Sequence, residues 1–306
     1  MRKFSPEGTL INTPENRSYL RSQRSLEDAM ARGRILEAYT LLCDSSHNLI
    51  VELGSMKGII PRIEGAAGIE SGETKDIALI TKVSKPISFI VTGFTQDELG
   101  NTMAVLSRRK VQEDCISEYI SRLVPGDIIP ARVTHLEQFG AFVDIGCGVP
   151  SLIPIDAISV SRISHPADRF KVGQEIKVVV KAVRDGRVWL SHKELLGSWE
   201  ENAAMFSAGQ TVSGIVRSAE SYGVFIELAP NLAGLAEPRD NLFPGQNATV
   251  YIKALIPEKM KVKLIIVDLP EERPELKPIR YFTDASHIDR WVYSSEASGK
   301  LIQTVF

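Results

Sequence analysis

The stretch FGAFVDIG, Phe139 to Gly146, recurs eighty-three residues later as YGVFIEL, which begins at Tyr222. Both copies place a glycine directly after one aromatic residue and a second aromatic three positions after the first. Side chains alternate between the two faces of a strand, so aromatics at this odd spacing should point to opposite faces. A pattern that recurs in register indicates a repeated structural unit, and it leaves the direction of the two rings to be explained.

The sequence around Phe139 predicts five short strands: PGDIIPARVTHLEQ, GAFVDIG, PSLIP, GQEIKVVVKAV and RVWLS. Runs of β-branched residues separated by glycine-containing turns are typical of a closed antiparallel barrel. A copy that begins after residue 205 repeats all five segments, with eleven fewer residues between its second aromatic and its fourth strand. An earlier copy is degenerate, because His47 and Ile50 stand where the aromatics should be.

These repeats predict an all-β-dominated chain of three tandem barrels joined by short helices, with a small C-terminal extension. Residues 284–306 predict a short helix capped by Asp284 or Ser286, followed by a strand. The TKDIALITKV segment of the first copy predicts a turn of helix, and Trp291 and Tyr293 are expected to dock on a barrel. The expected divisions are an N-terminal arm (1–28), a degenerate barrel (29–110), a helical linker (111–123), a barrel (124–194), a second helical linker (195–205), a shortened barrel (206–269) and the extension (270–306).

Composition narrows the class of protein. The formal net charge is −2 over 306 residues, so any basic surface for a nucleic acid must come from folding that separates the charges. No apolar run approaches the roughly 18 residues of a membrane helix, and the N-terminus has no apolar stretch typical of a signal peptide. The scattered Cys43, Cys115 and Cys147 favour reduced thiols. We therefore expect a cytoplasmic protein that does not contact membranes.

The combined pattern resembles the S1 RNA-binding domain, the repeat of the largest protein of the small ribosomal subunit. The matching segments are FGAFV in strand two, SLIP in strand three, VGQEIKVVV in strand four and GRVWLSHKE in strand five. Three such copies resemble a short bacterial homologue of that ribosomal protein. The resemblance implies OB-type barrels whose second and third strands bind oligonucleotides. It implies single-stranded RNA, including messenger RNA, as the partner, and a role in translation with the ribosome as a further partner.

The resemblance also implies how the aromatics are used. In this family both rings lie on one binding surface, because the first sits at the junction of loop and strand and the glycine relaxes the backbone there. Phe139 with Phe142, and Tyr222 with Phe225, should therefore form two exposed platforms on which bases stack.

Other family positions are matched unevenly. The strand-three histidine is replaced by Pro61, Pro154 and Glu237 in the three copies, and the aspartate near strand five has only Asp185 as an approximate match. The strand-five arginine is matched by Arg187, with Lys261 in the third copy and Thr102 in the first. We therefore rank the second copy as the best RNA-binding barrel and the third as weaker, and expect the first to be structural or protein-binding.

Further candidates for RNA contacts are basic or lie in loops. Lys177 and Lys181 are four residues apart and so are expected on one strand face, while Arg132 belongs to strand one and His165 to the loop before strand four. Ordinary solvated surface charges explain the three basic residues equally well. His192 is expected at the surface.

The sequence contains no set of residues typical of an enzyme. Its five histidines show no metal-ligand spacing, and no glycine-rich phosphate loop follows a strand. Asp144 and Glu227 repeat at one barrel position, which favours a role in the fold or at the surface over a role as a catalytic acid. We expect no catalysis, cofactor or metal. Two alternatives remain open beside translation: a scaffold that contacts proteins, and an accessory RNA-binding subunit of an RNA-decay or transcription complex.

Overall fold

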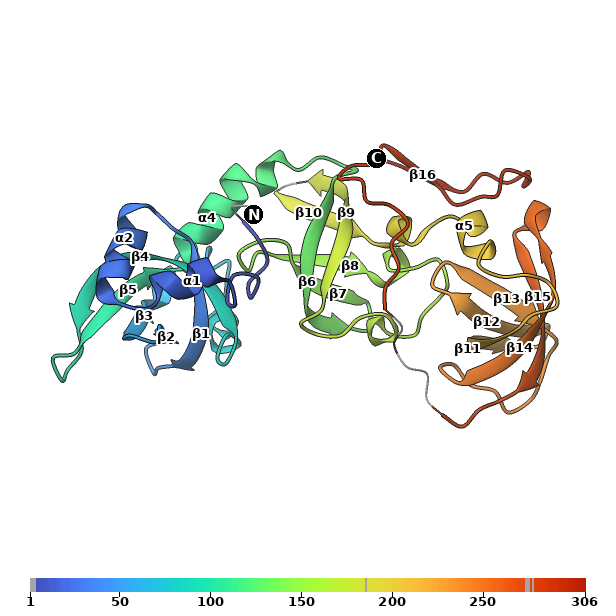
Figure 1. Cartoon of the computed structure of the whole chain (residues 1–306), viewed down its shortest axis with the longest axis horizontal. Coiled ribbons are helices and arrows are strands. Elements are labelled where there is room, and N and C mark those ends of the chain that lie inside the picture. Colours follow the sequence, from blue (N-terminus) through green and yellow to red (C-terminus); the bar gives the residue numbers. More distant parts are fainter. Residues whose placement is uncertain (1–3, 185, 273–275, 277) are drawn as a thin grey trace. The chain divides into compact units, whose positions relative to one another are not determined.

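The strands form three closed five-stranded barrels, as the repeats predict (Figure 1). The computed structural model describes residues 4–184, 186–272, 276 and 278–306, so the Asp185 match lies outside the described residues. The chain divides into two compact units, Met1–Arg122 with Asp144–Pro150, and Leu123–Val143 with Ser151–Phe306. The first barrel lies in unit 1. The third barrel and all but the 144–150 connection of the second lie in unit 2.

The three barrels share one connectivity. In each, the first strand pairs antiparallel with the second and fourth, and the third runs parallel to the fifth, which closes the sheet without a free edge. The strands of the first barrel are β1 (Leu36–Cys43), β2 (Leu49–Glu52), β3 (Lys57–Ile60), β4 (Pro86–Gln96) and β5 (Thr102–Ser107). Those of the second are β6 (Ile128–Glu137), β7 (Gly140–Asp144), β8 (Pro150–Pro154), β9 (Glu175–Arg184) and β10 (Arg187–Ser191). Those of the third are β11 (Thr211–Glu220), β12 (Gly223–Ala229), β13 (Leu232–Ala236), β14 (Asn247–Ile256) and β15 (Lys261–Asp268).

The helices are short. The α-helices are α1 (Pro14–Tyr19), α2 (Gln23–Ala31), α3 (Ile77–Ile80), α4 (Arg109–Glu118) and α5 (Trp199–Ala203). The 3₁₀ turns are Arg62–Glu64, Ile120–Arg122, Ile155–Ala157, Pro166–Asp168, Lys193–Leu196 and Pro257–Lys259. The predicted turn of helix in the first copy is confirmed as α3. Between the second and third barrels, Gly197 adopts a φ of +82° and interrupts the helical path before Ser198 caps α5.

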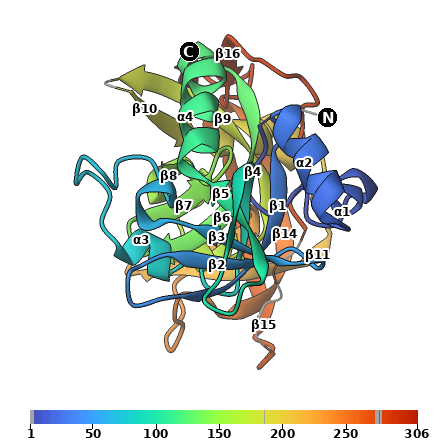
Figure 2. The same cartoon turned by 90° about the vertical axis from the view of Figure 1, so that its left-hand side faces the viewer.

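The N-terminal residues pack on the first barrel. Helix α2 lies against β4 (Figures 1 and 2), and its Leu26 and Ala29 are fully buried in that barrel's core. Glu7 is buried and paired with Arg108, whose Nε lies 2.6 Å from the Glu7 carboxylate. Burial alone would raise the pKa of Glu7, but the Arg108 and Lys82 side chains hold it at about 2. The N-terminal segment is thus attached by both apolar packing and an ion pair.

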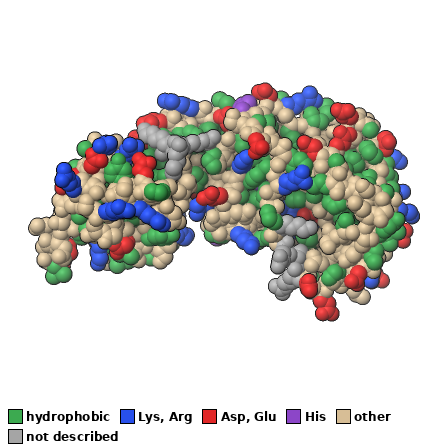
Figure 3. Space-filling model, in the orientation of Figure 1, with side chains coloured by type: hydrophobic (Ala, Val, Ile, Leu, Met, Phe, Trp, Pro, Cys, Tyr) green, Lys and Arg blue, Asp and Glu red, His purple; other side chains and the backbone are tan. Residues whose placement is uncertain are grey.

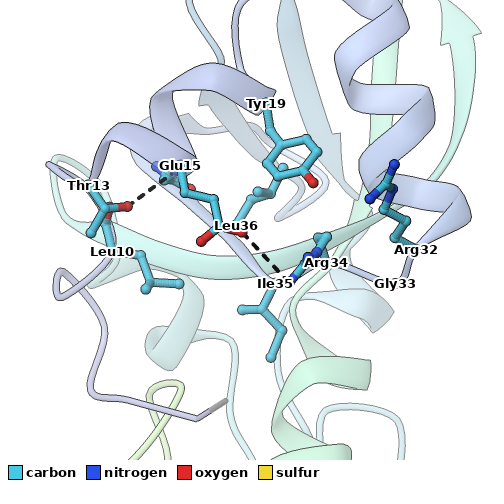
Figure 4. Close-up of a pocket in the computed structure, with 10 residues that line it drawn as sticks. Leu10, Thr13, Glu15, Tyr19, Arg32, Gly33, Arg34, Ile35 and Leu36 are labelled. Carbon is cyan, nitrogen blue, oxygen red and sulfur yellow. Dashed lines mark hydrogen bonds and ion pairs between the residues drawn. The ribbon is translucent and has the colours of Figure 1, made fainter. Parts of the chain in front are cut away.

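A cavity of about 720 Å³ opens beside this segment (Figure 4). Its walls come from α1, the α2–β1 turn and the start of β1, and include Thr13, Tyr19 and Leu36. Arg32 and Arg34 at its rim have acidic partners, Asp28 and Glu15 respectively. The cavity therefore has no charged group without a counter-ion to suggest a particular ligand.

The expected helix near Asp284 is wrong, because the C-terminal extension forms a hairpin of β16 (Arg290–Val292) and β17 (Gln303–Val305). The chain before the hairpin pairs with the second barrel instead of coiling, and the Ile128 N–H donates to the Ser286 carbonyl at 2.8 Å. The expected docking is confirmed. Tyr293 is buried in the core of the third barrel and donates its hydroxyl hydrogen to the Asn231 carbonyl, and Trp291 packs beside it.

Two glycines at the start of β7 and β12 explain how the repeated stretch folds. A Cβ on Gly140 would lie 2.4 Å from the Ile153 carbonyl oxygen, and one on Gly223 would lie 2.7 Å from that of Ala236. In both barrels the third strand therefore passes so close to the second that only glycine fits. The aromatic before each glycine lies in the preceding turn, outside the strand, where alternation of side chains does not apply.

Replacing Gly140 with alanine should destabilise unit 2, because the new methyl group meets backbone that cannot rotate away. We expect a loss of about 1–3 kcal/mol in the free energy of unfolding. Urea unfolding followed by tryptophan fluorescence reports on this unit, since Trp189, Trp199 and Trp291 all belong to it. Gly299→Ala is the matched control, because nothing lies within 4 Å of its Cβ position. Equal urea midpoints for the two variants would contradict the close-approach argument.

Candidate nucleic-acid interface

The two aromatic pairs come together as predicted. The ring centroids of Phe139 and Phe142 are 5.9 Å apart with an interplanar angle of 87°, and those of Tyr222 and Phe225 are 6.1 Å apart at 83°. The first ring of each pair is open to solvent, with Phe139 56% and Tyr222 66% exposed, while the second rings are half-buried. Each pair therefore offers one continuous aromatic surface on the outside of its barrel.

The second barrel extends this surface with a residue that sequence reasoning missed. The His135 ring of β6 stacks on Phe142 at 6.3 Å and 30°, and its Nε2 lies 2.6 Å from the Glu137 carboxylate. In the third barrel Ser218 is paired with Phe225, so no ring stands there. The second barrel thus has three neighbouring rings where the third has two.

A row of outward residues crosses each barrel from strand two to strand five. In the third barrel, Phe225 pairs with Leu235, which pairs with Lys263. In the first barrel the row is aliphatic, Ile50, Ile59 and Val105. In the second, Leu152 pairs with Trp189, whose side chain is 49% exposed. The signal for Trp189 was present in RVWLS, because Val188 and Leu190 on either side face inward.

This register also corrects one alignment. Arg187 and Lys261 lie two residues before Trp189 and Lys263, and the residue two before Val105 is Met103, not Thr102. Thr102 has the parity of the buried Ala104, so it belongs to the other face of β5. The first barrel therefore has no aromatic pair on β2, and neither Met103 nor Val105 supplies a cation on this face of β5.

Three predicted basic residues are open to solvent, namely Arg187, Lys181 and Lys261. None of them forms an ion pair within the described parts of the chain. Lys181 is the additional residue at a β-bulge, since Trp189 pairs with Ala182 and the next residue pairs with Val180. All three are therefore available for phosphate contacts.

Other predicted residues have partners inside the protein. Arg132 is paired with Glu175. Lys177 is half-exposed and contacts the C-terminal extension. Its Nζ lies 3.4 Å from the Asp284 carboxylate and 5.5 Å from the centroid of the Tyr281 ring.

His165 caps a short 3₁₀ turn, where its Nδ1 accepts a hydrogen bond from the Ala167 N–H at 3.1 Å. At the strand-three position, Pro154 is half-buried and Glu237 is exposed. Neither replaces the family's histidine as a stacking group.

The expectation that His192 is at the surface is wrong, because only 1% of the residue is exposed. Its Nδ1 donates to the Ile158 carbonyl at 3.0 Å, and its ring packs edge-on against Phe170 and Tyr281. Long-range packing from the loop and the C-terminal extension covers it, which the local sequence does not reveal. Burial lowers the pKa of His192 to about 4, so the ring is neutral at neutral pH.

Asp144 and Glu227 have roles in the fold, as their repetition suggested. Asp144 accepts hydrogen bonds from the backbone N–H groups of Glu7, Gly146 and Gly148 within unit 1. Burial raises the pKa of Asp144 to about 6.

In unit 2, the second and third barrels meet at a buried ion cluster. Glu227 of β12 pairs with Arg169, from the loop before β9, and with Arg217 of β11. Arg217 is also 3.2 Å from the Asp168 carboxylate. The nearby Asn231 side chain donates to the Lys193 and Gly197 carbonyls and accepts from the Val160 N–H. Every charge in the cluster has an opposite partner. Since Asp168 and Arg169 belong to the second barrel and Arg217 and Glu227 to the third, the ion pairs join the two barrels.

Acidic and basic side chains are interspersed on the face drawn in Figure 3, in keeping with the low net charge. Among the described residues, no group of three or more His, Cys, Asp or Glu side chains is arranged to hold a metal ion. No helix in the described ranges is both long and apolar enough to cross a membrane.

Residues 123–193, which form the second barrel, match the model of the S1 RNA binding domain family. Most of this chain is homologous to the small ribosomal subunit protein bS1. It is 32% identical to bS1 of Leuconostoc lactis over 193 residues, which cover 57% of this chain and 44% of that protein. The bS1 homolog of Bacillus subtilis (strain 168) is 30% identical over 245 residues, 74% of this chain and 61% of that protein. The chain thus spans about half the length of the curated relatives it matches.

This chain also aligns with the crystal structure of a multidomain protein with nucleic acid binding domains from Streptococcus pneumoniae. The alignment covers 80% of this chain and 73% of that protein's chain. The identity is 14% and the TM-score is 0.25, so the alignment supports no inference about function or arrangement.

The buried His192 makes the stability of unit 2 depend on pH. The unfolded chain takes up a proton on this ring near pH 6.5 and the folded chain only near pH 4, so unfolding binds protons between these values. Stability should therefore fall as the pH is lowered from 6.5 to 4, by up to about 3 kcal/mol. The check is the tryptophan-detected urea midpoint at pH 7 and 4.5. His192→Asn keeps a donor for the Ile158 carbonyl but does not titrate, so its midpoint should fall less. An equal fall would exclude His192 as the cause.

Proposed function

We propose that this chain binds single-stranded RNA, with bases stacked on the outward aromatics of the second and third barrels, and that it acts in translation on messenger RNA or the ribosome. The observation that carries the proposal is the pair of edge-to-face rings, exposed at the same place in both barrels. An aromatic face accepts any unpaired base, at roughly 1–3 kcal/mol per base. The bases of a duplex are already stacked and cannot reach such a surface.

The proposed contacts divide into stacking and phosphate groups. Phe139, Phe142, Tyr222 and Phe225 supply the stacking surfaces. Open cations on the same barrels, Arg187 and Lys181 in the second and Lys261 in the third, neutralise phosphates. Arg132, Lys177 and His165 remain secondary candidates, because each must leave an internal partner to touch RNA.

The second barrel is proposed as the stronger RNA-binding module. It combines its aromatic pair with the His135 ring and with Arg187, whereas the third places Glu237, which repels phosphate, at the strand-three position. The first barrel has an aliphatic row in place of the rings. That row favours protein contact as the function of the first barrel, so the scaffold alternative applies there.

The proposal requires no catalytic group, cofactor or metal, and a role in translation places the protein in the cytoplasm. The module itself does not distinguish translation from RNA decay or transcription, because the same barrel serves each through different partners. Translation is preferred because the homologous proteins are named as small ribosomal subunit proteins.

Truncating the exposed rings should weaken RNA binding without unfolding the barrels. We expect Phe139→Ala to reduce affinity for an unstructured, labelled RNA by about 5- to 100-fold, and Tyr222→Ala to reduce it less. Phe142→Ala and Phe225→Ala should follow the same order. Fluorescence anisotropy at low and moderate salt measures these affinities, and circular dichroism checks each fold.

Duplex RNA and single-stranded DNA serve as competitors in the same titration. Binding of the wild-type chain should weaken as salt rises, because phosphate contacts release counter-ions. No binding of single-stranded RNA even at low salt would overturn the proposal. A loss of binding in the Tyr222 and Phe225 variants alone would instead reverse the ranking of the two barrels.

A further inference from the structure

Trp189 differs from the other tryptophans of the chain in its surroundings. Trp199 is 2% exposed in the core beside the third barrel, and Trp291 packs on that core. Trp189 is 49% exposed although it lies in the middle of β10 rather than in a loop. Apolar area left in contact with water forgoes the free energy that burial would provide, so a partner that covers this indole gains that free energy. The fold gives no reason for the exposure, since alternation along β10 permits any polar residue there.

The neighbours of Trp189 are those of an RNA contact. Trp189 pairs with Leu152 of β8. The corresponding row of the third barrel begins with Phe225. Arg187 lies two residues earlier on the same face of β10, and the bulge residue Lys181 lies beside the Ala182 that pairs with Trp189. An exposed indole with one open cation on its own strand and another on the neighbouring strand suits a stacked base with its flanking phosphates.

The residue at the position of Trp189 differs in chemistry among the three barrels. It is Val105 in the first, Trp189 in the second and Lys263 in the third. Lys263 is exposed, as are Lys261 on the same strand and Lys253 at the equivalent bulge. None of these three lysines has an acidic partner among the described residues. The third barrel therefore presents a cluster of cations where the second presents an indole and two cations.

We propose that Trp189 forms an additional stacking subsite for an unpaired nucleobase on the second barrel, and that Lys263 makes the same place in the third barrel a phosphate contact. The inference rests on the proposed RNA binding and deepens it. The second barrel then holds RNA chiefly by stacking, and the third chiefly by charge. It also follows that the indole of Trp189 touches the RNA, so binding should alter its fluorescence.

The experiment titrates the full chain with an unstructured single-stranded RNA and reads both anisotropy of the RNA and tryptophan fluorescence. Trp189→Ala should weaken binding about 10- to 100-fold, and Trp189→Phe, which keeps an aromatic face, at most about threefold. The change in tryptophan fluorescence on binding should disappear in both variants. Tyr39→Ala is the matched control, because it removes an equally exposed aromatic (49%) from the first barrel.

A second pair of variants tests the exchange of roles. Trp189→Lys should bind more weakly at moderate salt and show a steeper dependence of affinity on salt, while Lys263→Trp should show a shallower one. Unfolding midpoints close to the wild-type value confirm that each variant is folded. If Trp189→Ala and Trp189→Lys bind as the wild type does while Phe139→Ala does not, the subsite is excluded and the proposed function stands. If the wild-type chain binds no RNA, both the stacking subsite and the proposed function are excluded.

Discussion

The absence of a side chain at Gly140 and Gly223 is the constraint on which the candidate interface depends. Each glycine lets the third strand pass within contact distance of the second, and each directly follows an aromatic residue in the preceding turn. The aromatic of the turn can therefore contact the aromatic of the strand edge to face, although the two residues are an odd number of positions apart. A methyl group at either position would separate the strands and disturb both the closure of the barrel and the alignment of the rings.

Much of the fold could be predicted because its determinants are local and repeated. Alternating β-branched segments and turn glycines specify the same five strands in each copy, and the second and third copies add two aromatics in register, so three barrels follow from the repeated pattern. The aromatic pairs were predictable for the same reason. Short-range rules failed where distant segments decide the environment. His192 is buried against Tyr281 of the C-terminal extension, and Ser286 pairs with β6 instead of entering a helix.

The interface was predicted incompletely for a different reason. A resemblance to a family carries over only the residues that the family shares, and His135 and Trp189 lie outside that set. The ring contact of His135 with Phe142 becomes visible only in the structure, whereas the alternation of RVWLS already indicated that Trp189 faces outward. The same register shows that the row from strand two to strand five is aliphatic in the first barrel, with Ile50, Ile59 and Val105, so this row differs in chemistry among the three copies.

The ion cluster of Arg169, Arg217, Glu227 and Asp168 has a consequence for multivalent binding. It joins the second and third barrels within one compact unit, so their separation is set by packing rather than by a flexible tether. Under the proposed function, an RNA bound by one barrel would meet the other at a high effective concentration, provided that the RNA is long enough to span the two surfaces. Two individually modest modules can in this way act as one tight binder, and release requires both to let go together.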